Sequence, residues 1–205
     1  MKKLGLFLLP TIAITLLAGG SAFAQGDNSI YFVTYFSNAH TTGSADAVLR
    51  LINDGDASTA QSRGVPNGTL FASLYMFDDS QEMQECCNCS VSADGMLSES
   101  VNRNLMSNTL TGRLEMNRGV IKIISSTTND PTNNVLSPGL RGTITHIQIG
   151  PNAVGKMRSF IAEAAVADSN LSTVEKTDLE MTCGFVITLG SGYGTCSCSP
   201  EDQDF

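Results

Sequence analysis

The chain of 205 residues contains no tryptophan, four tyrosines and only two histidines, His40 and His146. It therefore offers few of the aromatic platforms on which sugars and nucleobases stack. Basic residues are also scarce, because twelve lysines and arginines stand against twenty acids and form no cluster. Since proteins bind phosphate backbones through clustered lysine and arginine, this composition argues against nucleic-acid binding.

Motifs of the common enzyme classes are absent as well. The chain has no G-x-S-x-G, no H-E-x-x-H and no P-loop. The glycine-rich segment 190–194 follows an expected helix instead of preceding one, so it does not resemble a phosphate cradle. We predict no enzyme, no cofactor and no small-molecule substrate. The alternative is catalysis by scattered carboxylates such as Asp78, Asp79 and Glu82.

What the chain does contain begins with an export signal. Two lysines and an apolar run over residues 4–18 precede a small-x-small cleavage site at residues 21–24. We predict a signal peptide over residues 1–24 and a single secreted domain over residues 25–205. No later apolar run reaches the ~18 residues that a membrane-spanning helix needs. The expected location is extracellular or on the cell surface, with the periplasm as the alternative.

Short β-prone runs, divided by Gly, Asn, Asp and Pro, dominate the mature chain. Because no helices alternate with them, we predict a mainly β protein with an antiparallel β-sandwich of the Ig-like or jelly-roll type. The expected strands cover residues 30–36, 47–52, 70–77, 119–125, 142–149 and 158–166, with weaker candidates at 96–101 and 110–116.

One α-helix is expected near the C-terminus, over about residues 172–189. Residues 172–175 match a capping box, in which Ser and Glu side chains satisfy free backbone N–H groups. Apolar side chains then recur at helical spacing, at Leu179, Cys183, Val186 and Leu189. Gly184 costs about 1 kcal/mol relative to alanine. The alternative is a shorter helix that ends before Gly184, followed by a strand over residues 185–189.

All six cysteines lie in the mature part of the chain. They form two clusters, Cys86, Cys87 and Cys89, and Cys183, Cys196 and Cys198. An even number in an exported protein favours disulfides. Cysteines this close in sequence pair poorly with one another, so we expect three bonds between the clusters, with the connectivity open. The alternative is a metal site, since clustered thiolates suit Cu(I) or Zn, although the spacing is not the usual C-x₂-C.

Two acidic turns raise the question of Ca²⁺, which prefers several oxygen ligands. The first covers residues 78–82 with Glu85, and the second covers residues 53–56. Neither fits the EF-hand pattern, so we expect solvated turns and no metal.

The first expected strand is apolar on both faces. Ile30, Phe32 and Phe36 lie on one face, and Tyr31, Val33 and Tyr35 lie on the other. Since an edge strand usually has one polar face, this strand is expected at the centre of its own sheet. The alternative is an N-terminal arm that completes a neighbouring subunit by β-strand addition.

Several stretches resemble a group of uncharacterised secreted bacterial proteins. They are residues 47–53 (AVLRLIN), 74–78 (LYMFD), 85–89 (ECCNC), 119–122 (GVIK) and 196–198 (CSC). The ECCxC block is the most specific of them. The resemblance implies secretion and a cysteine-stapled β domain, and it implies no activity.

Together these observations predict a secreted, non-enzymatic structural or adhesive protein. We expect a subunit of a filament, matrix or surface layer that assembles with copies of itself through its first strand. The alternative is a secreted protein that binds a small ligand or a metal.

Overall fold

The computed structural model describes residues 28–37, 39–57, 65–112, 117–151 and 154–198. The predicted signal peptide over residues 1–24 lies outside these ranges. Within them, no helix combines the length and the apolar character that crossing a membrane requires.

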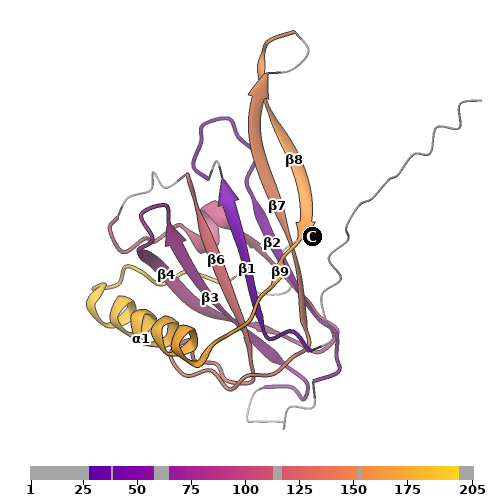
Figure 1. The fold of residues 1–205 in the computed structure, drawn as a ribbon, viewed down its shortest axis with the longest axis vertical. Coiled ribbons are helices and arrows are strands. Elements are labelled where there is room, and N and C mark those ends of the chain that lie inside the picture. Colours follow the sequence, from indigo (N-terminus) through magenta and orange to yellow (C-terminus); the bar gives the residue numbers. More distant parts are fainter. Residues whose placement is uncertain (1–27, 38, 58–64, 113–116, 152–153, 199–205) are drawn as a thin grey trace, which may run out of the picture.

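Two antiparallel sheets form the body of the protein (Figure 1), which confirms the predicted β-sandwich. The first sheet has the strand order β4-β3-β6-β1-β9, and the second has the order β5-β2-β7-β8. The strands are β1 (Tyr31–Ser37), β2 (Val48–Asn53), β3 (Leu70–Asp78), β4 (Met83–Val91), β5 (Met96–Ser100), β6 (Arg118–Ser126), β7 (Leu140–Pro151), β8 (Met157–Ala165) and β9 (Ala167–Asp168). A short π-helix, η1 (Val101–Leu105), follows β5.

The main core lies between the two sheets. It collects the inward side chains of the alternating strand pattern, including Phe32, Phe36, Leu49, Leu74, Ile123 and Ile144, all of which are buried. Burying a side chain of this kind contributes about 1.5–3 kcal/mol. Both sheets therefore contribute to this main core.

A second, smaller core lies on the outer face of the first sheet, under the helix α1 (Thr173–Leu189) (Figure 1). Leu179, Cys183 and Val186 of α1 bury their side chains in it. The hydroxyl of Ser172 accepts a hydrogen bond from the N–H of Glu175 at 3.0 Å, which is one of the two bonds of a capping box. The predicted C-terminal helix is therefore present. The alternative of a shorter helix is wrong, because Val186 reaches this core only if the helix continues past Gly184.

Two other expectations about strands need correction. The segment 83–91 was not expected to be a strand, yet it forms β4 and pairs with β3. The weaker candidate at 110–116 is a turn at its start, and its residues 113–116 lie outside the described part. The sheet packing overrides weak local preference at β4, since that strand is buried on both faces for most of its length.

The hairpin of β7 and β8 extends beyond the sandwich as a ribbon (Figure 1). β7 pairs with β2 only over residues 140–144, whereas it pairs with β8 over residues 143–151. The outer half of β7 thus has β8 as its only strand neighbour in the described chain. We call this hairpin, residues 145–151 and 154–165, the ribbon.

Candidate functional site

The first cysteine cluster lies in β4, where successive side chains point to opposite faces of the sheet. Cys86 points into the small core under α1, whereas Cys87 and Cys89 point into the main core. Adjacent cysteines therefore meet different partners because they lie on different faces of one strand.

Three disulfides join the two cysteine clusters, which confirms the predicted pairing between them. The bonds are Cys86–Cys183, Cys87–Cys196 and Cys89–Cys198. The paired Cα atoms lie 5.8, 5.3 and 5.5 Å apart, within the usual range for disulfides. The first bond fastens α1 to β4, and the other two fasten the C-terminal tail, residues 190–198, to the same strand.

Three of these sulfur atoms gather closely enough to suggest a metal site. The Sγ atoms of Cys87, Cys89 and Cys198 all lie within 4.8 Å of one another. Each of them belongs to a disulfide, however, and a metal binds the thiolate form of cysteine. The oxidised protein therefore has no thiolate ligand at this place.

The C-terminal tail covers the outer edge of β4. The N–H of Cys86 donates to the carbonyl of Gly194 at 2.9 Å, and Thr195 forms a parallel bridge with Cys86. Asn108 holds the tail from the other side. Its carbonyl accepts from the N–H of Gly194 at 2.7 Å, and its side-chain amide donates to the carbonyl of Gly192 at 2.8 Å. The tail thus pairs with the outer edge of β4 at Cys86, where a backbone group would otherwise be exposed.

Glu85 lies beneath this tail and is fully buried. Its Oε1 accepts a hydrogen bond from the backbone N–H of Asn108 at 2.8 Å, and its Oε2 has no partner among the described residues. Burial away from water raises the pKa of the Glu85 carboxyl to about 8, against a smaller lowering by the Asn108 hydrogen bond. Glu85 is therefore a buried acid that holds its proton at neutral pH, and it is not part of an exposed calcium turn.

In the acidic turn at residues 78–82, the carboxylate of Asp78 accepts hydrogen bonds from neighbouring residues of the chain. Oδ1 of Asp78 accepts hydrogen bonds from the backbone N–H groups of Ser80 and Glu82, both at 2.9 Å. Oδ2 of Asp78 accepts from the side-chain amide of Gln84 at 2.9 Å. This is the pattern of a turn closed by an aspartate side chain.

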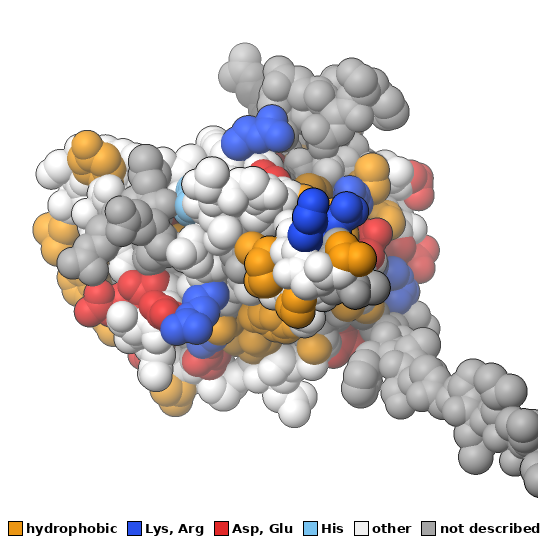
Figure 2. Space-filling view, turned by 90° about the horizontal axis from the view of Figure 1, so that it is seen from above, with side chains coloured by type: hydrophobic (Ala, Val, Ile, Leu, Met, Phe, Trp, Pro, Cys, Tyr) orange, Lys and Arg blue, Asp and Glu red, His pale blue; other side chains and the backbone are white. Residues whose placement is uncertain are grey.

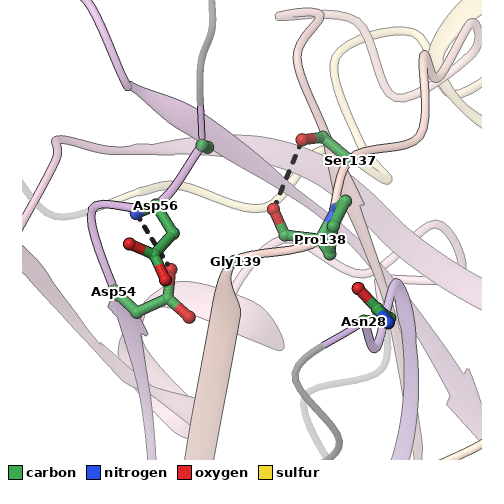
Figure 3. Close-up of a pocket in the computed structure, with 7 residues that line it drawn as sticks. Asn28, Asp54, Asp56, Ser137, Pro138 and Gly139 are labelled. Carbon is green, nitrogen blue, oxygen red and sulfur yellow. Dashed lines mark hydrogen bonds between the residues drawn. The ribbon is translucent and has the colours of Figure 1, made fainter.

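The second acidic turn borders a pocket of about 400 Å³. Figure 3 shows Asp54 and Asp56 on one side of the strand end at Gly139 and Asn28 on the other side. Oδ2 of Asp54 also lies 3.3 Å from a guanidinium nitrogen of Arg141. Because the oxygens do not converge and one carboxylate has a cationic partner, the geometry does not support a calcium site here.

Asn53 anchors this turn from inside the protein. Its side-chain amide donates to the carbonyl oxygens of Gly68 and Val91 at 2.8 and 2.9 Å. Its Oδ1 accepts from the N–H of Gly55 at 3.1 Å. The side chain is completely buried, and the bonds to Gly68 and Val91 are shielded from water.

Replacing Asn53 by alanine is expected to lower the free energy of unfolding by about 2–3 kcal/mol, because it leaves buried backbone groups without partners. Chemical denaturation measures this loss. The matched control is Asn133→Ala, whose side chain is exposed, and it should change stability by less than about 0.5 kcal/mol. Equal effects of the two substitutions would contradict the structural role of Asn53.

Asp79 and the two histidines have structural partners. Asp79 forms an ion pair with Arg118 at 2.9 Å. The Nε2 of His40 lies 3.3 Å from a backbone carbonyl oxygen. The ring of His146 stacks on Tyr35 with 4.1 Å between ring centroids, and burial lowers the pKa of His146. Nothing in these contacts assembles an acid–base pair.

The first strand lies inside its own sheet. β1 pairs with β6 over seven residues and with β9 over two. Phe32 and Phe36 point into the main core, and the hydroxyl of Tyr31 donates to Glu175 of α1 at 2.9 Å. The other residues of the predicted assembly strand are Ile30 and Val33, which are partly buried beside the small core, and Tyr35, which is exposed.

The strand with the most accessible edge is β8 instead. It ends its sheet, and no named strand covers its outer edge along nine residues. Nearly all of its side chains are exposed on both faces, including Phe160 and Ile161. The sequence shows the apolar alternation of this strand, yet it cannot show that the face expected to be buried has no partner. The length of β7 beyond β2 accounts for that exposure in the outer part of β8.

Comparison with protein-family models, curated proteins and solved structures finds no match for this chain.

Proposed function

We propose that this chain is a secreted structural or adhesive subunit that assembles with copies of itself by β-strand addition. The observation that carries the proposal is the open edge of β8. Edge strands of natural proteins are usually short, charged, bulged or covered, because their free N–H and C=O groups recruit other strands. Of the four end strands, β4 pairs with the tail at Cys86, β9 has two residues and β5 has five, whereas β8 has nine and projects from the body.

The proposal assigns the accepting edge to β8 and not to β1. Strand exchange through β1 would require it to leave β6 and to remove Phe32 and Phe36 from the main core. Addition at β8 uses backbone groups that already face outward, so it costs no buried contact. The partner strand that we propose is β8 of a second copy, in antiparallel pairing.

Substitution at β8 tests this assignment. The double substitution Phe160→Lys and Ile161→Lys places two charges on an edge whose side chains are 50% and 61% exposed. We expect it to abolish the assembly of the mature protein while leaving the fold intact, because charged side chains protect sheet edges. Size-exclusion chromatography with light scattering and electron microscopy measure assembly.

The matched control is Val135→Lys with Leu136→Lys, an adjacent apolar pair that is 52% and 39% exposed and lies away from β8. It should assemble like the unsubstituted protein. A mature protein that stays monomeric at every concentration would contradict the proposed self-assembly. Assembly that continues unchanged in the β8 variant would also overturn it.

A further inference from the structure

The helix α1 carries an apolar face that nothing in the described chain covers. Val174, Met181, Phe185 and Leu189 are between 53% and 72% exposed. At 100° per residue they share one side of the helix, opposite Leu179 and Cys183, which face the small core. Surface helices usually turn a polar face outward, so an apolar outer face on a helix indicates a contact surface. We call these four residues the α1 stripe.

One exposed acid lies on the α1 stripe. The helix contains three acids, Glu175, Asp178 and Glu180, and a single lysine. Glu175 and Glu180 form ion pairs at 2.6 Å with Lys122 and Lys176. Asp178 is exposed and, by helical spacing, falls between Val174 and Met181 on the stripe. A partner for this surface should therefore be apolar with a positive charge.

The tip of the ribbon has those properties. Val154 and Met157 are 76% and 63% exposed, beside the exposed basic residues Lys156 and Arg158. From residue 142 to residue 162 the chain contains no acid, although its net charge is −8. Figure 2 looks down on this end of the molecule and shows hydrophobic and basic side chains next to one another there.

We propose that the ribbon tip of one copy docks on the α1 stripe of the next copy. The two surfaces are complementary in charge and both are apolar, and they lie at opposite ends of the molecule (Figure 1). A contact between two different surfaces is heterologous, and repeating it builds open chains or closed rings instead of two-fold dimers. This inference rests on the proposed self-assembly, to which it adds a head-to-tail contact through side chains.

A charge exchange tests the contact on the mature protein. Arg158→Glu alone and Asp178→Arg alone each place like charges opposite one another, so each should raise the concentration for half-assembly about tenfold. The chain that carries both substitutions restores opposite charges and should assemble near the original concentration. Sedimentation velocity measures the three variants beside the unsubstituted protein.

Cross-linking locates the contact directly. A carbodiimide should join Lys156 of one copy to Asp178 of another in a mixture of ¹⁴N- and ¹⁵N-labelled protein, detected by mass spectrometry. The matched control for the charge changes is Glu82→Arg, an exposed acid on a turn outside α1, which should leave assembly unchanged.

Outcomes for the two proposals can be separated. If the single charge variants and Phe185→Lys assemble like the original protein while the β8 variant does not, the head-to-tail contact is wrong and strand addition stands. If no form assembles, both are wrong. The competing occupant of the ribbon tip is an anionic membrane. Binding to phosphatidylglycerol vesicles that Arg158→Glu weakens, with assembly unchanged, would overturn the docking on α1.

Discussion

Reducing the three disulfides is expected to unfold the protein at about 37 °C. The bonds join residues 97, 109 and 109 positions apart. In the chain-entropy description, closing one loop of that size lowers the entropy of the unfolded chain and so stabilises the folded state by about 4–5 kcal/mol. Since a domain of this size has a net stability of about 5–15 kcal/mol, losing all three constraints removes much of it. Circular dichroism during heating, with and without reductant, measures the change.

The three bonds should contribute unequally. Replacing Cys89 and Cys198 by alanine should cost only about 1 kcal/mol, because Cys87–Cys196 still closes a loop of equal length. Replacing Cys86 and Cys183 should cost about 3–4 kcal/mol, because both side chains are fully buried and no other disulfide holds α1. Guanidinium denaturation without reductant compares the two double variants. Equal losses would show that burial and redundancy do not set the contribution of each bond.

The fold was accessible from sequence where local preference and tertiary structure agree. The run Gly119–Ser125 is rich in isoleucine and valine and forms β6 at the centre of its sheet. The capping box at residues 172–175 and the apolar spacing that follows it predict α1. At these places each residue suits its final environment, which is the condition under which pattern and fold coincide.

β4 shows why part of the fold escaped prediction. Its sequence, Met83–Val91, holds one β-branched residue and no aromatic residue, so its β-propensity is weak. It becomes a strand because β3 supplies a ladder on one side, while α1 and the tail are bonded to its cysteines. The helix and the tail lie about 100 positions from β4, at a distance that no local window covers.

The candidate interfaces were harder to predict than the cysteine bonds. The even number of cysteines and their two clusters predict pairing between clusters without any coordinates. Whether β1 or β8 has a free edge depends on strand order, which alternation does not encode. The exposure of the outer face of α1 was equally hard to predict from sequence. Its apolar residues resemble core residues, and only the structure shows that the sheet lies on one side of the helix.

Glu85→Gln is expected to change how stability depends on pH. Burial raises the pKa of Glu85 to about 8 in the folded protein, from 4.5 for an ordinary glutamate. Between these values the folded state holds a proton that the unfolded state has released. The contribution of Glu85 is therefore complete below about pH 4.5 and is lost as pH rises towards about 8. A pKa rise of that size corresponds to a loss on the order of 5 kcal/mol.

The glutamine variant carries no ionisable proton at this position, so its stability should not share that loss. Above pH 8 the free energy of unfolding of this variant should exceed that of the original protein by about 2–4 kcal/mol. Near pH 4.5 the two free energies should differ little. Urea denaturation at a series of pH values gives the difference between the two curves, in which the other titrating groups cancel. The matched control is Glu82→Gln, which lies three residues away on an exposed turn. Its curve of stability against pH should run parallel to that of the original protein.

The position of Glu85 also says where the loss of stability should appear first. Its Oε1 holds the backbone of Asn108, and Asn108 in turn holds Gly192 and Gly194 of the C-terminal tail. Ionising a carboxylate beneath this tail favours the entry of water, so amide exchange should quicken at residues 108 and 194 before it does so in β6. Uniform exchange across the sheet, or parallel pH curves for Glu85→Gln and the original protein, would show that Glu85 is ionised in the folded state without cost.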